Sequence, residues 1–383
     1  MNCAPNKKPP DQAGFDTARA LFLRPGPSRS ESCFLRTALF HGYDLHSAVA
    51  VLAFGHADLY PAHPEMAFDR EAMKQRAAEL AAKGVFIGTS SWKYEGWYGQ
   101  LYTPARYEYR GKLAKTRFQR DCLSEYAKVF KTVCVDAAYY DFPRHEYLQG
   151  LADQVPDDFR FGFKVTDALT LKKFPKLDRF GAKAGQPNRD FLNADLFATA
   201  FLKPCEDIRQ KVGVLMFEFS RFWPSDYEHG RVFVADLDTF LGKLPKGWPY
   251  AIEMRNKHWL RDEYFGCLAR HGVTHVFNSW DAMPPVSEQM ALPGSRTNPE
   301  LVAARFLLKP GRRYEDAVKA FQPYDKTQEV NEDAREAGAG LIVEGESYEP
   351  HRKTYIYVNN RLEGNALETI SAMLDVLERA AGN

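Results

Sequence analysis

The triplet Glu253-Met254-Arg255 has the clearest chemical meaning in this sequence, because it places opposite charges two positions apart in an apolar run. In a strand, residues two apart point to the same face, so both charges would face the same interior while Met254 faces the other way. Buried charges are costly unless they pair or contact a ligand. The triplet therefore predicts either an ion pair that braces the fold or a site in which Glu253 exchanges a proton and Arg255 binds an anionic group.

Polar side chains also stand at the ends of other short apolar runs. Lys164 and Arg305 would neutralise negative charge on a ligand, and the carboxylates of Asp136, Glu218 and Glu253 are the kind of group that holds a hard cation such as Mg²⁺. The strand-end set comprises Thr89, Asp136, Lys164, Glu218, Asn278, Arg305, Asn359 and Asn360. No cofactor is predicted; the alternative is a divalent cation held by the three carboxylates.

The stretch 353–377 shows the local pattern that would position these residues. Tyr355 to Val358 are apolar and β-prone, Asn359 and Asn360 follow at once, and apolar residues recur at helical spacing from Ala366 to Leu377. This order predicts a strand, a polar loop and a helix. Open α/β sheets and barrels bind ligands where such strands end.

The same alternation of short apolar runs and helical patterns recurs along the chain. The expected strands are 85–89, 132–136, 160–165, 212–217, 250–254, 274–277, 302–308 and 354–358. The expected helices between them include 121–130, 146–154, 194–210, 232–241 and 261–271. Eight such units predict a TIM-type (β/α)₈ barrel, in which all strand ends meet at one mouth, and a doubly wound open sheet is the alternative.

Two segments stand apart from this pattern. Residues 1–65 are rich in Pro, Ser, His and Ala without sustained periodicity, which predicts an irregular or disordered extension. The alternative is that synthesis begins at Met66 or Met73. Residues 66–383 are expected to form a single barrel domain that begins with a helix over 67–82. The segment 167–191 is long and mildly basic, which predicts a mobile loop that is either solvated or acts as a lid.

Composition narrows the classes of function. The chain of 383 residues has 51 Lys and Arg against 50 Asp and Glu, a formal net charge of +1, so nothing draws the whole molecule to nucleic acid or an anionic membrane. The six cysteines have no metal-ligand spacing, and His258, His271 and His275 are expected on the surface or in loops. No apolar run approaches the roughly 20 residues of a membrane span, so a cytoplasmic location is expected. The oligomeric state is not indicated.

Four segments, in order, resemble the YecE-like family, catalogued as domain of unknown function 72. They are GTSSWKYEGWYGQLY (88–102), FRFGFKV (159–165), AIEMRNKHW (251–259) and VNNRLEGNA (358–366). The resemblance runs from about Gly84 to the end of the chain. It implies a TIM-type barrel with a site at its mouth, but no reaction, because the family has no established activity.

The chain departs from the family pattern at several positions, which marks it as a divergent member. Ser91 stands where the family usually has Gly, and Asn256 where it usually has His. The second-strand motif keeps its aromatic pair but has lost its Glu, Asn and Thr, and the His of the seventh-strand motif is absent after Arg305. Any role that depends on the lost side chains does not carry over.

The leading hypothesis is an enzyme that acts on a small anionic or sugar-like molecule in a polar pocket at the barrel mouth. The predicted catalytic residues are Glu253, as general acid or base, and Lys164. The predicted substrate-binding residues are Thr89, Trp92, Asp136, Tyr140, Glu218, Arg255, Trp259, Arg305, Asn359 and Asn360.

Two other classes of function stay open. A nucleic-acid-binding or -processing protein would use the aromatic and basic residues of 94–110 to stack bases and contact phosphates. A non-catalytic metabolite-binding protein would release its ligand unaltered. The sequence identifies neither the substrate nor the reaction.

Overall fold

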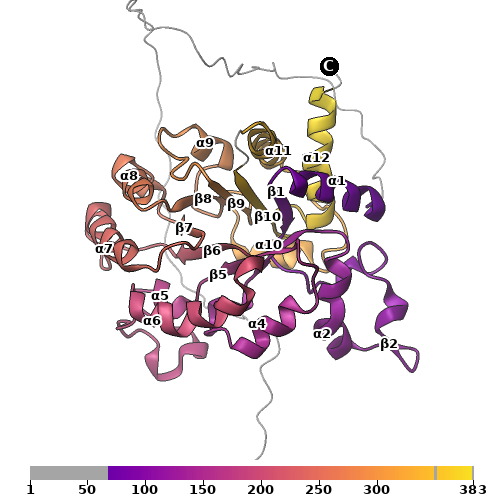
Figure 1. The fold of residues 1–383 in the computed structure, drawn as a ribbon, viewed down its shortest axis with the longest axis horizontal. Helices are drawn as coiled ribbons and strands as arrows, with labels where there is room; N and C mark the ends of the chain where they lie inside the picture. Colours follow the sequence, from indigo (N-terminus) through magenta and orange to yellow (C-terminus); the bar gives the residue numbers. More distant parts are fainter. Residues whose placement is uncertain (1–67, 349–351, 382–383) are drawn as a thin grey trace, which may run out of the picture. The chain divides into compact units, whose positions relative to one another are not determined.

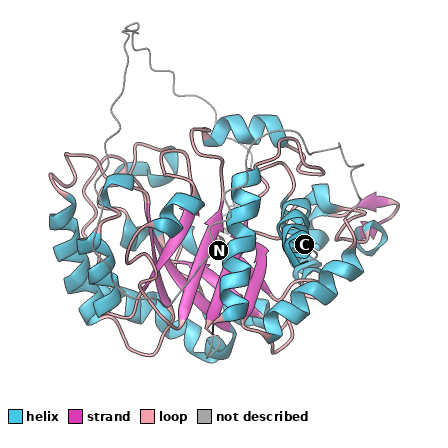
Figure 2. Ribbon diagram, turned by 90° about the horizontal axis from the view of Figure 1, so that it is seen from above, coloured by secondary structure: helices cyan, strands magenta, loops and turns pink. Residues whose placement is uncertain are grey.

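The protein is described by a computed structural model that covers residues 68–348 and 352–381. Eight parallel strands close into a barrel surrounded by helices (Figure 1; Figure 2). Around the barrel the strands follow the order β1 (Val85–Thr89), β10 (Lys353–Val358), β9 (Leu301–Phe306), β8 (Thr274–Ser279), β7 (Tyr250–Met254), β6 (Val212–Phe219), β5 (Arg160–Lys164) and β4 (Thr132–Val135). Because β1 pairs with both β10 and β4, the predicted TIM-type barrel is confirmed and the open sheet is excluded.

Helices follow the strands along the chain. The longer ones are α1 (Arg70–Ala82), α2 (Lys115–Tyr126), α4 (His145–Ala152), α7 (Gly230–Lys243), α8 (Asp262–Arg270), α9 (Val286–Ala291), α10 (Tyr314–Phe321), α11 (Glu332–Ser347) and α12 (Ala366–Ala381). Short helices are α3 (Ala137–Tyr140), α5 (Asp167–Thr170) and α6 (Ala194–Leu196), and a small hairpin pairs β2 (Glu108–Tyr109) with β3 (Lys112–Leu113). None of the helices in the described ranges is both long and apolar enough to cross a membrane. The predictions for residues 1–65 lie outside the described residues.

The strands are buried on both faces, which explains their continuous apolar character. Every residue of β1, β6, β7, β8 and β9 is buried, because helices cover the outside of the barrel and side chains fill the inside. The expectation for His275 was wrong for this reason. His275 lies in β8 and packs against Tyr264 and Phe265 of α8, and burial lowers its pKa to about 3.

Two tyrosines fill the interior of the barrel. Tyr355 stacks on Phe86 at 5.0 Å between ring centroids, and the Tyr357 hydroxyl lies 3.2 Å from Thr132 Oγ1. Both rings occupy space that glycines leave open: a Cβ atom on Gly162 would lie 2.6 Å from Tyr357 Cζ, and one on Gly213 would lie 2.7 Å from Tyr355 Cε1. The tyrosine layer therefore forms a solid floor beneath the carboxyl ends of the strands.

The segment 167–191 is anchored to the barrel by its own contacts. The buried Asn188 side chain donates to the carbonyls of Ala168 at 2.8 Å and Leu171 at 2.7 Å. Arg179 Nη1 lies 2.7 Å from Asp167 Oδ2. These contacts hold both ends of the segment, so the predicted lid movement would be confined to the residues between them.

The glycines of the barrel interior provide a test of this packing. Gly162→Ala is expected to lower the free energy of unfolding by about 1–3 kcal/mol, because the new methyl group overlaps Tyr357. Gly150→Ala is the matched control, since Gly150 lies in α4 and a methyl group added there would have no other atom within 4 Å, and it is expected to stabilise the protein by about 0.5–1 kcal/mol. Urea unfolding of both variants checks the difference, and equal effects would contradict the packing argument.

Candidate functional site

One inward-facing polar residue comes from the carboxyl end of each barrel strand. Side chains alternate along a strand, and each of these residues lies two positions beyond a core residue or glycine of the barrel interior. We call this set the mouth layer: Ser90, Asp136, Lys164, Glu218, Glu253, Asn278, Arg305 and Asn359. Polar groups from all eight strands thus meet above the tyrosine floor.

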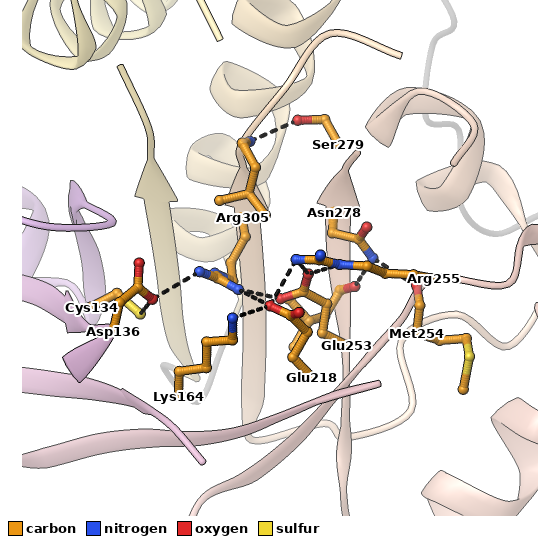
Figure 3. A network of polar contacts seen from close by, with 12 residues as sticks. Cys134, Asp136, Lys164, Glu218, Glu253, Met254, Arg255, Asn278, Ser279 and Arg305 are labelled. Atoms are coloured by element: carbon orange, nitrogen blue, oxygen red, sulfur yellow. Dashed lines mark hydrogen bonds and ion pairs between the residues drawn. The ribbon is translucent and has the colours of Figure 1, made fainter. Parts of the chain in front are cut away.

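Five members of the mouth layer form a continuous charge network with Arg255 (Figure 3). The charge network consists of Asp136, Lys164, Glu218, Glu253, Arg255 and Arg305. Arg305 Nη1 lies 2.6 Å from Glu253 Oε2 and 3.3 Å from Glu218 Oε2, while its Nη2 lies 3.2 Å from Asp136 Oδ1. A single guanidinium on β9 therefore bridges carboxylates that belong to β7, β6 and the end of β4.

Glu218 lies at the centre of the charge network. One of its oxygens, Oε2, is 2.6 Å from Lys164 Nζ and 2.7 Å from Arg255 Nη2. Burial alone would raise the pKa of Glu218, but Arg255, Lys164 and Arg305 outweigh it and lower that pKa to about 2. Glu218 is therefore ionised at neutral pH although it pairs in register with Glu253 on the neighbouring strand.

Glu253 and Arg255 face the same side of β7, as the alternation requires. Glu253 Oε1 accepts from Arg255 Nε at 3.0 Å and Nη2 at 2.9 Å, and its Oε2 accepts from Arg305. The Glu253 side chain is 0% exposed. Because both oxygens are engaged with arginines, Glu253 in this structure orients the two guanidinium groups instead of facing the mouth.

The most accessible side chains of the charge network are Asp136, which is 34% exposed, and Lys164, which is 12% exposed, followed by Arg255 at 10%. Aromatic rings support two of the cations. Lys164 Nζ lies 3.5 Å from the centre of the Tyr139 ring, and the Arg255 guanidinium lies 3.8 Å from the Trp280 ring. Trp280 was not predicted; its only signal in the sequence is its position directly after β8.

Thr89 and Asn360 lie at the mouth but turn away from the charge network. Thr89 Oγ1 donates to the Ser91 carbonyl at 2.6 Å and lies 3.0 Å from the Tyr126 hydroxyl of α2, so Ser90 takes the inward position. Asn360 Oδ1 accepts from the backbone N–H of Ala366 at 2.7 Å, at the first residue of α12. Both side chains serve the connection between strand and helix.

Three predicted aromatic residues also lie apart from the charge network. Trp92 lines a surface cavity of about 260 Å³ between α2 and α4. Trp259 stacks on Phe222 at 5.6 Å and Phe233 at 5.5 Å. Tyr140, at the end of α3, is largely exposed. The connections after β1, β4 and β7 set the directions of all three rings, and the strand pattern carries no information about them.

Asn359 shares the mouth with the charge network without a hydrogen bond to it. Its backbone N–H donates to the Phe306 carbonyl at 2.8 Å, and its Oδ1 accepts from the Arg361 N–H at 3.0 Å. The β1–β10 register pairs Thr89 with Val358, so Asn359 lies beside the end of β1. It therefore belongs to the mouth layer, three strands away from Glu253 around the barrel.

The carboxylates of the mouth do not form a free cation site. Asp136, Glu218 and Glu253 all contact Arg305, so a divalent ion would have to displace a bound guanidinium. Within the described ranges, the group of side chains close enough to share a metal ion is Asp238, Cys267 and His271, on α7 and at the end of α8. Arg270 Nη2 already contacts Asp238 Oδ1 at 2.8 Å, which disfavours a cation there too.

Comparison with known proteins gives a family match and matches among solved structures. The family described as "Protein of unknown function DUF72" matches residues 86–383. A DUF72 family protein of Enterococcus faecalis V583 is 20% identical with a TM-score of 0.51, over 77% of this chain and 95% of that chain. One of Thermotoga maritima MSB8 is 19% identical with a TM-score of 0.47, over 78% and 99%. No curated protein matches the sequence.

The charge network predicts a large penalty for removing one of its members. Glu253→Ala is expected to lower the free energy of unfolding by about 3–5 kcal/mol, because Arg255 and Arg305 would keep their charges without the carboxylate between them. Glu206→Ala is the matched control: Glu206 pairs with Arg209 at 3.4 Å on the surface, and its loss should cost about 0–1 kcal/mol. Equal losses in urea unfolding would contradict the assigned role of Glu253.

The lowered pKa of Glu218 predicts a pH-dependent contribution to stability. Its pKa falls from an ordinary 4.5 to about 2 in the folded protein, so ionised Glu218 stabilises the fold fully above pH 4.5 and this contribution is lost as the pH falls toward 2. Glu218→Gln lacks the contribution at every pH. The difference in unfolding free energy between wild type and variant should therefore shrink between pH 4.5 and 2. A constant difference across that range would refute the assignment.

Proposed function

The chain belongs to the DUF72 family, a family of unknown function with a TIM-type barrel, and we propose that this member is an enzyme acting on a small polar molecule at the barrel mouth. The charge network is the observation that supports this proposal. It brings six charged side chains together at the end of the barrel where enzymes of this fold carry their active sites. Such fixed charges stabilise the charges that develop during a reaction without reorganising.

The exposure of the side chains favours a division of roles. Asp136 and Lys164 are the most accessible members of the charge network, so they are the groups proposed to contact the substrate and exchange protons with it. Glu253 and Arg305 are buried and paired with each other, which favours a positioning role for both. The proposal therefore moves the acid–base function from Glu253 to Asp136 and keeps Lys164 as a catalytic residue.

The charge balance of the network bears on the class of substrate. Its three carboxylates and three cations sum to a formal charge of zero, and each cation already contacts a carboxylate. Such a network offers both donors and acceptors to a group rich in hydroxyls. A compact anion would bind weakly, because the cations of the network are already neutralised by carboxylates. The exposed rings of Tyr140 and Tyr314, in the connections after β4 and β9, offer flat apolar faces as well. These features favour a substrate whose sugar-like portion lies against the charge network.

The nucleic-acid alternative gains no support from the residues that suggested it. Trp97 and Tyr107 are fully buried, and Tyr94 and Tyr98 pack against the core. Tyr109, on the small hairpin, is the one exposed ring among the aromatic residues of 94–110. Buried rings do not stack on bases, so the small-molecule proposal is preferred.

Ligand screening by thermal shift tests the proposal. A library of sugars, sugar acids and small metabolites is measured against wild type, Asp136→Asn and Lys164→Met. The controls are Asp158→Asn and Lys131→Met, which break a 2.6 Å ion pair just before β5 and β4, at the opposite ends of the same two strands. Hits should stabilise the wild type and both controls, and lose most of that stabilisation in the two mouth variants.

The screen can refute the proposal in two ways. Hits that stabilise the mouth variants as well as the wild type would place binding elsewhere, and a library without any hit would count against a small-molecule site. Mass spectrometry of each hit after incubation then separates the two remaining classes. A converted hit identifies an enzyme, and one recovered unchanged identifies a non-catalytic binding protein.

A further inference from the structure

Arg361 is a cation of the barrel mouth that lies outside the charge network. It follows β10 by three residues, and its guanidinium lies 4.5 Å from the centre of the Tyr314 ring. Two further tyrosines, Tyr94 and Tyr324, lie close to it and pack against each other at 5.6 Å between centroids. We call Tyr94, Tyr314 and Tyr324 the tyrosine box. Its members come from the connections after β1 and β9, the two neighbours of β10 in the barrel.

Arg361 differs from the other mouth cations in its lack of an ion pair. Lys164, Arg255 and Arg305 each contact a carboxylate within 3.0 Å. No carboxylate oxygen among residues 68–348 and 352–381 lies within 4.0 Å of Arg361. A partly buried guanidinium without a counter-ion is costly, and the aromatic faces of the box compensate only part of that cost.

Unpartnered donors lie along the same loop. Arg361 Nε is buried without a hydrogen-bond partner in the described part of the chain, and the same holds for the side-chain Nδ2 atoms of Asn359 and Asn360. These two asparagines are 2% and 0% exposed. Buried donors are ordinarily satisfied, so the unused N–H groups of Asn359 and Arg361 indicate a loop suited to oxygen-rich acceptors, whereas Asn360 faces the start of α12.

We propose that Arg361 and the tyrosine box bind the acidic group, a carboxylate or a phosphate, of the molecule whose remaining hydroxyls lie over the charge network. This inference rests on the proposed function and narrows the substrate class to small polyhydroxylated acids or phosphorylated sugars. Oxyanions suit the site because the guanidinium fork binds them through two parallel hydrogen bonds.

Asp136 connects the two parts of the site. It contacts Arg305 at 3.2 Å and also acts electrostatically on Arg361. Burial lowers the pKa of Arg361, but the tyrosine box and Asp136 outweigh this and raise it, so the guanidinium is charged at any physiological pH. The negative charge of Asp136 is shared with Arg305, which limits its repulsion of an anion held at Arg361.

Anion binding tests the inference directly. Inorganic phosphate and acetate are titrated separately at constant ionic strength, with chloride as the reference, and binding is followed by thermal shift and intrinsic fluorescence. The proteins are wild type, Arg361→Met, Arg361→Lys and the matched control Arg313→Met, whose arginine is paired with Asp316 at 3.0 Å outside the box. At least one anion should bind wild type and control alike and bind Arg361→Met about tenfold more weakly, equivalent to about 1.4 kcal/mol.

The two anions and the two substitutions separate the outcomes. Binding of acetate alone identifies a carboxylate subsite, and binding of phosphate alone a phosphate subsite. Arg361→Lys keeps the charge and should restore part of the affinity, which separates loss of the cation from loss of folding. Unchanged affinity in Arg361→Met, or no binding by the wild type beyond chloride, would overturn the inference.

A further variant distinguishes failure of this inference from failure of the proposed function. Lys164→Met should keep the affinity for the small anion, because the two cations belong to different parts of the mouth. If Lys164→Met loses the anion and Arg361→Met retains it, the acidic group belongs to the charge network and the Arg361 subsite is refuted. The proposed function would then still stand on the ligand screen.

Discussion

The contact of Arg305 with three carboxylates is the interaction on which the rest of the barrel mouth depends. Arg305 extends from β9 to Glu253, Glu218 and Asp136, which belong to three other strands around the closed barrel. Without this guanidinium, only the other two cations of the charge network would compensate the adjacent buried carboxylates of Glu218 and Glu253. Closure of the barrel brings these strand ends together, and the guanidinium of Arg305 then compensates the carboxylates that closure places side by side.

The tyrosine floor explains why the charges gather at one end of the barrel. Tyr355 and Tyr357 fill the interior opposite Gly162 and Gly213, so the space beneath the mouth is already occupied. The same packing that stabilises the barrel thus leaves Asp136 and Lys164 as the most accessible members of the charge network and keeps Glu253 beneath them.

The mouth combines two environments with different electrostatics. The charge network is formally neutral and rigidly paired, whereas Arg361 has aromatic neighbours and no counter-ion among the described residues. A molecule that carries hydroxyls at one end and an acidic group at the other would match both parts. Under the proposed function, this division would let a site with a balanced set of charges select an anionic molecule.

The sequence by itself determined the eight strands and the polar residues at their ends, because each rests on a local burial pattern. It favoured a barrel in which Asp136, Lys164, Glu218, Glu253, Arg255 and Arg305 converge, and the pairing of β1 with both β10 and β4 decided between that barrel and an open sheet. Only the tertiary structure decided which cation meets which carboxylate, and that Ser90 faces inward in place of Thr89, since a shift of one residue reverses the face of a strand. It also decided the directions of Trp92, Tyr140 and Trp259 and the meeting of Arg361 with three tyrosines. These side chains lie in the connections that follow the strands, whose conformations depend on contacts with segments far away in the sequence and leave no periodic signal.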